Sequence, residues 1–171
     1  NQATSVDSYN TAVGYSAGVA MTTGVRNTLM GGLAGDALTD ADYNTVMGYN
    51  ALSTDTLGSR STALGYYALA SQNFTTATNT FNTAVGFGAG EAISTGVQNT
   101  LIGGQAGDAL SDADFNIAIG TDALTVDTLG SRSVAIGRRA LYTQNFTTAT
   151  DNYNVAVGFE AGNDITTGVR N

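Results

Sequence analysis

Small and apolar residues recur along the chain at a fixed spacing, in a unit of which Asn-Thr-Ala-Val-Gly at residues 82–86 is one copy. Nine copies each place a glycine after a short run of β-branched and aliphatic residues: Gly14, Gly31, Gly48, Gly65, Gly86, Gly103, Gly120, Gly137 and Gly158. The spacings are 17, 17, 17, 21, 17, 17, 17 and 21 residues. Coils of about 17 residues are therefore grouped into a superrepeat of four coils and 72 residues, and this regularity decides the architecture.

Four positions are nearly constant when the coils are aligned on this motif glycine. The fourth residue before it is Asn or Ser, the residue before it is aliphatic or Met, and the fourth after it is Gly or Leu. The third residue after it is always alanine: Ala17, Ala34, Ala51, Ala68, Ala89, Ala106, Ala123, Ala140 and Ala161. Such a repeat indicates one continuous array rather than separate globular domains.

A coil of 17 residues is too short for a helical hairpin and fits one turn of a β-solenoid with two short strands and two turns. The motif is rich in residues that favour strands, and the glycine follows where the backbone must turn. We predict an all-β fold, a parallel β-solenoid or β-roll of about nine coils of 17–21 residues. Coils stacked about 4.8 Å apart would give a rod of roughly 43 Å. The recurring Asn residues should then stack as a ladder of side-chain amides.

The repeat also sets the internal boundaries. Residues 1–9 are predicted to form a partial N-terminal coil, residues 10–81 the first superrepeat, residues 82–153 the second and residues 154–171 the start of a third. We number the coils 1 to 9, beginning at Asn10, Asn27, Asn44, Ser61, Asn82, Asn99, Asn116, Ser133 and Asn154. The chain begins without Met and stops at the first residue of a tenth coil, so we expect it to be an excerpt of a longer array.

Coils 4 and 8 are four residues longer than the others. Stacking forces every coil to share one cross-section, so the added residues should leave at a turn. We expect loops at Gln72-Asn73-Phe74-Thr75 and at Gln144-Asn145-Phe146-Thr147, both on the same edge of the rod.

Alternate residues of a strand face opposite sides, and both sides of the motif strand lack charge. One side carries Thr, Val or Ile and then an aliphatic residue or Met; the other carries Ala12, Leu29, Val46, Ala63, Ala84, Leu101, Ala118, Ala135 and Ala156. A thin coil has one interior, so a strand that is apolar on both faces predicts a second burial surface, which we assign to another subunit. The alternative is a monomeric solenoid whose outer strip is merely small and neutral.

Composition narrows the function. The chain contains no His, Cys or Lys, so the usual general bases, nucleophiles and transition-metal ligands are missing, and we predict no enzyme, cofactor or metal site. The net charge of −8 argues against nucleic-acid binding and against an anionic membrane surface. No apolar run approaches the length of a membrane span, so we expect no membrane insertion.

One cluster of carboxylates, Asp36, Asp40 and Asp42, recurs as Asp108, Asp112 and Asp114. Oxygen ligands in a turn could hold Ca²⁺, although the spacing does not match an EF-hand loop. A solvated acidic turn is the other interpretation, and the sequence leaves both open.

Two further groups of residues are candidates for surface contacts. Arg60 and Arg132 could pair with Asp55 and Asp127 of the same turn. Coil 4 is aromatic, and its rings could stack on a sugar, contact a neighbouring fibre or cover an open flank of the coil: Tyr66, Tyr67, Phe74 and Phe81.

The repeated Asn-x-Ala-Val/Ile-Gly-x-x-Ala unit resembles the head repeats of trimeric autotransporter adhesins of the YadA type. Residues 44–52, Asn-Thr-Val-Met-Gly-Tyr-Asn-Ala-Leu, are similar to arrays in phage tail-fibre and related bacterial surface proteins. The resemblance covers about residues 9–171 and implies a left-handed parallel β-roll, three chains around one axis, and a role in adhesion or as a fibre shaft. Family coils are often shorter than seventeen residues, and the strict 72-residue superrepeat departs from their pattern.

We therefore expect a structural shaft segment of an extracellular, cell-surface or virion tail fibre. Its partner would be itself, as a homotrimer and as an end-to-end filament. A second hypothesis is an adhesin module that binds a host-surface or glycan receptor through the long-coil loops. A third is ice binding by the column of threonines that starts at Thr11, although this column lapses at Ile117, Val134 and Val155.

Overall fold

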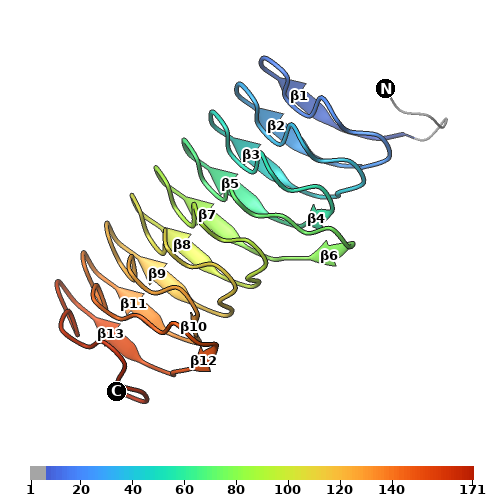
Figure 1. Ribbon diagram of the computed structural model, residues 1–171. Coiled ribbons are helices and arrows are strands. Elements are labelled where there is room, and N and C mark those ends of the chain that lie inside the picture. The colour runs from blue at the N-terminus through green and yellow to red at the C-terminus, as the bar shows by residue number, and fades with distance from the viewer. Residues whose placement is uncertain (1–6) are drawn as a thin grey trace.

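The computed structural model describes residues 7–171, which form a rod-shaped parallel β-solenoid (Figure 1). One three-residue strand from each coil stacks into a nine-stranded parallel sheet in the order β1-β2-β3-β5-β7-β8-β9-β11-β13. The strands are β1 (Thr11–Val13), β2 (Thr28–Met30), β3 (Thr45–Met47), β5 (Thr62–Leu64), β7 (Thr83–Val85), β8 (Thr100–Ile102), β9 (Ile117–Ile119), β11 (Val134–Ile136) and β13 (Val155–Val157). The predicted all-β solenoid of about nine coils is confirmed.

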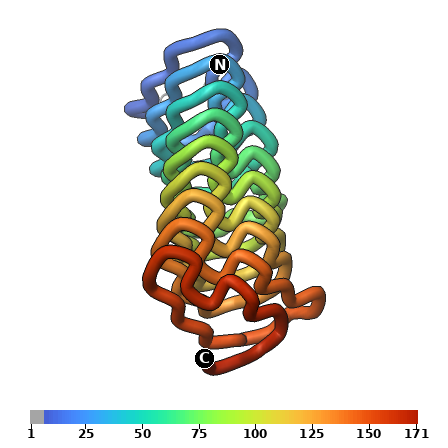
Figure 2. Tube along the Cα trace, turned by 90° about the vertical axis from the view of Figure 1, so that its left-hand side faces the viewer, coloured from blue at the N-terminus to red at the C-terminus, as the bar shows by residue number. Residues whose placement is uncertain are grey.

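Equivalent residues of successive coils lie side by side along the whole rod. Thr28 pairs with Thr45 across a 17-residue coil, and Thr62 pairs with Thr83 across a 21-residue coil. The coils therefore stack one after another along the rod, as Figure 2 shows. Every strand position becomes a straight column of side chains parallel to the rod axis.

The sequence predicts a second strand in every coil. Among residues 7–171, such a strand occurs only at two junctions, the one between coils 3 and 4 and the one between coils 7 and 8. There β4 (Gly58–Ser59) pairs with β6 (Thr78–Asn79), and β10 (Gly130–Ser131) pairs with β12 (Thr150–Asp151). Elsewhere that side of the coil is joined by bonds from turns. Thr23 Oγ1, for example, donates to Asp40 Oδ1 at 2.6 Å. The second side of the solenoid is a stack of turns more than a sheet.

The motif glycines are required by the close approach of neighbouring coils. Gly86 has φ +142°, and a Cβ built on it would lie 2.4 Å from the carbonyl oxygen of Gly103 in the next coil. A side chain at this position would both strain the backbone and push two coils apart.

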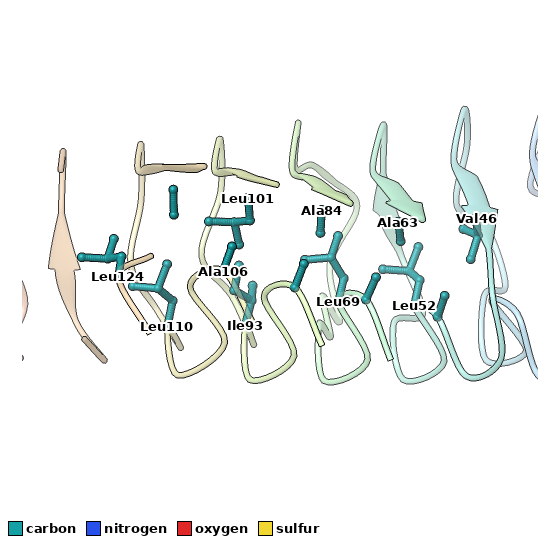
Figure 3. Packing of buried hydrophobic residues seen from close by; sticks show 14 of the residues in the cluster. Val46, Leu52, Ala63, Leu69, Ala84, Ile93, Leu101, Ala106, Leu110 and Leu124 are labelled. Atoms are coloured by element: carbon teal, nitrogen blue, oxygen red, sulfur yellow. The ribbon is translucent and has the colours of Figure 1, made fainter. Parts of the chain in front are cut away.

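Several columns of small and aliphatic side chains fill the interior, and Figure 3 shows part of them. The middle residue of each strand points inward, as Val46, Ala63 and Ala84 do, and these three are fully buried. Ala89 and its equivalents from Ala34 to Ala140 are also fully buried, so this column is enclosed. The outward side of the strand is therefore the one that carries Thr and the aliphatic residue or Met.

The Asn ladder exists, but its bonds differ from those predicted. Asn27 Oδ1 accepts from the backbone N–H of Asn44 at 2.9 Å, and Asn27 Nδ2 donates to the carbonyl of Ala41 at 2.7 Å. The side chain thus closes its own coil and binds the next one through the backbone. Direct bonds between amides are a minority, such as Asn27 Nδ2 to Asn10 Oδ1 at 3.2 Å.

Residues 1–6 of the predicted N-terminal partial coil lie outside the described residues. Residues 7–9 follow the path of a coil. The carbonyl of Ser8 accepts from Arg26 N at 2.7 Å, as the carbonyl of Val25 accepts from Tyr43 N at 3.0 Å.

The predicted position of the long-coil loops is wrong by about three residues. Gln72 is fully buried and Phe74 is 7% exposed, whereas Thr75, Thr76 and Ala77 are exposed. Leu57 N donates to the carbonyl of Phe74 at 3.0 Å, and Thr78 N donates to the carbonyl of Leu57 at 3.4 Å. The backbone bonds on either side of residues 75–77 both join Leu57, so these three residues bulge out of the rod. The equivalent bulge is 147–149, and β6 and β12, which follow the two bulges, lie on the same edge (Figure 1).

Candidate interaction face

Exposed apolar side chains are concentrated on one side of the rod. We define the apolar face by seven consecutive residues around each motif. They run from the residue that precedes the Asn or Ser to the residue that follows the motif glycine, for example residues 43–49. All the exposed large hydrophobic side chains among the described residues belong to this face, except Val19 and Val169. The opposite side carries polar turns and the bulges.

The centre of the face is the outer surface of the nine-stranded sheet. Its aliphatic column is Val13, Met30, Met47, Leu64, Val85, Ile102, Ile119, Ile136 and Val157. Met47 is 47% exposed and Ile102 is 38% exposed, although both lie in the middle part of the rod. The parallel column begins as threonine and becomes Ile117, Val134 and Val155 in β9, β11 and β13. No charged side chain occurs in either column.

One edge of the face is a ladder in which aromatic side chains alternate with arginines, with Gln98 in place of one arginine. It consists of the residues that precede the first residue of coils 1 to 9, together with Arg170: Tyr9, Arg26, Tyr43, Arg60, Phe81, Gln98, Phe115, Arg132, Tyr153 and Arg170. Arg60 lies 4.7 Å from the ring centre of Tyr43 and 5.9 Å from that of Phe81. Such contacts add about 0.5–1 kcal/mol each at exposed sites. The ladder was not predicted from the sequence, although alignment of the coils on their Asn residues displays it.

The other edge follows the motif glycine and changes between the two superrepeats. Tyr66 stacks on Tyr49 with ring centres 5.6 Å apart and on Phe87 at 5.4 Å. The equivalents in the second superrepeat include Arg138, whose Nη1 lies 3.6 Å from Glu160 Oε1. Aromatic stacking and ion pairing thus occupy the same edge at different heights.

The four aromatic residues of coil 4 do not form one cluster. Tyr66 and Tyr67 lie together at the glycine edge of the face, with ring centres 4.4 Å apart. Phe81 lies at the opposite edge, in the ladder, and Phe74 is buried beside the bulge. Only the first three can contact another molecule.

The carboxylates that could have held Ca²⁺ are engaged separately. Asp40 accepts from Thr23 Oγ1, and Asp42 Oδ1 accepts from Val25 N at 2.7 Å. Burial raises the pKa of Asp36 above its usual value of 3.8. Within residues 7–171, no group of three acidic, His or Cys residues is placed so that it could hold a metal ion.

The expected pairing of Arg60 with Asp55, and of Arg132 with Asp127, is wrong. Both aspartates are fully buried inside the solenoid. Arg60 instead donates from Nε to Asn79 Oδ1 at 2.9 Å, and Arg132 pairs with Asp151 at 3.0 Å. Because Asp55 and Asp127 are polar, the sequence alone could not show that they lie in the core and not at an exposed turn.

The part of the chain that the structure describes has no surface pocket, and it has no helix long and apolar enough to cross a membrane. No protein-family model, curated protein or solved structure matches the chain. The resemblance to YadA-type heads and tail-fibre repeats stays a prediction.

Proposed function

We propose that this chain is a structural shaft segment of a homotrimeric extracellular fibre, at a cell surface or in a virion tail, and that its apolar face is the interface between subunits. The observation that carries the proposal is the gathering of exposed large hydrophobic residues on one side of the rod. The polar side, with its turns and bulges, is then the surface of the fibre.

The size of the face supports a partner. Nine coils at about 4.8 Å give a length of about 43 Å, and the five residues from Thr to the residue after glycine span about 13 Å, which is four steps of about 3.3 Å. The resulting patch of about 560 Å² is at the upper end of what monomers expose. It is also uninterrupted along the rod and nearly free of charge, as the centres of subunit interfaces are.

The straight columns of the sheet suit subunits whose rods run parallel to one axis. The two edges of the face differ in chemistry, the ladder on one side and the post-glycine column on the other. A cyclic arrangement brings unlike edges of neighbouring subunits together, and closed cyclic symmetry is the common solution for homo-oligomers. The number three is supported by the resemblance to YadA-type heads.

Light scattering coupled to size-exclusion chromatography tests the proposal. The native chain should elute at three times its mass of 17.4 kDa. Val85→Asp places a charge at the centre of the face and should release monomers. Val19→Asp is the matched control, because Val19 is 69% exposed and lies off the face. A monomeric native protein, or equal effects of the two substitutions, would contradict the proposal.

A glycan-binding module is the second candidate, and the exposed stack of Tyr49, Tyr66 and Phe87 favours it, because aromatic rings present an apolar surface. The exposed part of the bulge, Thr75-Thr76-Ala77, offers no ring. A glycan array separates this candidate from a shaft. Ice binding has less support, because the threonine column ends at Ile117, and a thermal-hysteresis assay tests it.

A further inference from the structure

The interior of the rod contains one column whose chemistry alternates in pairs. It is formed by the seventh residue after each motif glycine: Met21, Leu38, Asp55, Gln72, Ile93, Leu110, Asp127, Gln144 and Ile165. All of these residues are buried except Ile165, which is partly buried. Two aliphatic coils are thus followed by two polar coils, twice over, at a depth where polar groups need partners.

The polar members are fully bonded, and their bonds join three successive coils. Asp55 Oδ1 accepts from Gly58 N at 3.0 Å and from Phe74 N at 2.9 Å, while Oδ2 accepts from Gln72 Nε2 at 2.5 Å. Gln72 Nε2 also donates to Ser61 Oγ at 2.9 Å, and its Oε1 accepts from Asn82 Nδ2 at 2.8 Å. Asp55 lies in coil 3, Gln72 in coil 4 and Asn82 in coil 5.

The second superrepeat repeats this arrangement. Gln144 Nε2 donates to Asp127 Oδ2 at 2.6 Å and to Ser133 Oγ at 2.9 Å, and its Oε1 accepts from Asn154 Nδ2 at 2.7 Å. The hydroxyl of Ser61 contacts Thr80 Oγ1, whereas that of Ser133 bonds to Asn152 Oδ1. We call the two networks the polar layers. Their shared feature is an Asp–Gln–Asn chain that crosses two coil junctions.

Several other internal columns tolerate a wrong neighbour. The fourth residue after the motif glycine does change between Gly and Leu, but it stays uncharged and needs no hydrogen-bond partner. The Asn or Ser, the motif glycine and the alanine recur in every coil, so a coil would find the same ladders if it stacked one place out of order. A similar hazard attends any repeat protein, in which non-native assembly uses the same contacts as native assembly. Only the column with Asp55 and Gln72 distinguishes the coils by polarity.

We propose that the polar layers are register marks, which allow coil 3 to stack on coil 4, and coil 4 on coil 5, and which disfavour a stack in which an aliphatic coil follows coil 3. Coil 3 stacked on coil 5 would set the Asp55 carboxylate against Ile93 and remove the amide of Gln72 and the N–H of Phe74. A buried carboxylate without these donors is strongly destabilising. An aliphatic coil stacked on another aliphatic coil meets no such penalty.

Deletion of whole coils tests the proposal. Removing residues 61–81 takes out coil 4 and stacks coil 3 on coil 5, with Asp55 against Ile93. Removing residues 44–81 takes out coils 3 and 4 and stacks coil 2 on coil 5, with Leu38 against Ile93. The larger deletion should therefore give the more stable rod, with a melting temperature about 10 °C higher than that of the smaller one. Removing residues 27–43 is the control, because Met21 then takes the place of Leu38 against Asp55.

A substitution provides an independent arm, because its effect should change sign with the background. In the full chain, Asp55→Leu leaves Gly58 N, Phe74 N and Gln72 without an acceptor and should lower the melting temperature. In the chain lacking 61–81 the same substitution removes the orphaned carboxylate and should raise it. The inference is overturned if the 44–81 deletion fails to fold or melts no higher than the 61–81 deletion, or if Asp55→Leu lowers the melting temperature in both backgrounds. Asp55 is buried inside one rod, so the change of sign in the effect of Asp55→Leu does not depend on the oligomeric state.

Discussion

Replacing Gly86 by alanine should open the solenoid at one junction. The added Cβ would lie 2.4 Å from Gly103 O, and real Cβ atoms keep at least 3.0 Å from such neighbours, so coils 5 and 6 must separate by about 0.6 Å. The bonds from Gly103 N to Val85 O and from Gln105 N to Phe87 O, both 2.8 Å, would lengthen to about 3.4 Å and weaken.

The cost can be worked out from its parts. Two weakened backbone bonds contribute about 1 kcal/mol each. The backbone at φ +142° adds about 1–3 kcal/mol for any residue other than glycine. The total of about 3–5 kcal/mol corresponds to a melting temperature lower by roughly 10 °C for a chain of this size. Thermal unfolding followed by circular dichroism measures it.

Two further glycines separate the clash from the backbone strain. Gly158 has φ +134°, but a Cβ there would meet nothing nearer than Ala161 Cβ at 3.8 Å, so Gly158→Ala carries strain alone. Gly14 lies in coil 1, which is at an end of the rod as coil 9 is. A Cβ on Gly14 would lie 2.3 Å from Gly31 O, so Gly14→Ala carries both the backbone strain and the clash. We expect Gly14→Ala and Gly86→Ala to cost more than Gly158→Ala. Equal losses for all three would refute the role of close coil contact.

Three other changes have defined outcomes. Ala89→Leu should overpack a fully buried column and cost about 1–3 kcal/mol in chemical denaturation, whereas an unchanged midpoint would mean that the site has free space. Burial raises the pKa of the Asp108 carboxyl, so the folded protein binds a proton there more readily than the unfolded protein does. The contribution of this carboxyl to the free energy of unfolding therefore falls as the pH rises through the raised pKa. Asp108→Asn should therefore raise the melting temperature at pH 7 and lose this advantage below the usual value of 3.8; a gain that is the same at both pH values would contradict it. Deleting residues 75–77 and 147–149 should leave the melting temperature within a few degrees of the native value. Deleting Gln72 to Thr75 should lower the melting temperature strongly, because the polar layer is lost. Similar losses from the two deletions would show that the bulges support the rod.

The fold could be predicted because its causes are periodic. A glycine at every seventeenth or twenty-first residue, an Asn four residues before it and an Ala three residues after it fix the coil length and the register without any knowledge of long-range contacts. The structure follows that register, as the pairing of Thr62 with Thr83 shows. The two-faced apolar strand likewise anticipated the exposed outer surface of the sheet.

The polar layers could not be predicted in the same way. Gln72 and Asp55 are polar residues near turns, and residues of these types are usually exposed. Gln72 and Asp55 can be buried because they bond to each other and because Gln72 also bonds to Asn82. Asp55 lies 17 residues and Asn82 lies 10 residues from Gln72 in the chain. For the same reason the bulge was placed on Gln72 and Phe74 instead of on residues 75–77. A column of core positions containing Leu38, Ile93 and Leu110 could have revealed the pattern, since Asp55 and Gln72 fall in register with them.

Winding the chain across the rod axis stores a large contour length in a short object. The 171 residues would span roughly 580 Å when fully extended, at about 3.4 Å per residue, whereas the rod is about 43 Å long. Each coil that detaches under tension would remove about 4.8 Å of rod and release about 58 Å of chain. A rod built from such coils would lengthen coil by coil under load, so a sudden pull would be converted into extension, which limits the peak force on the ends of the chain.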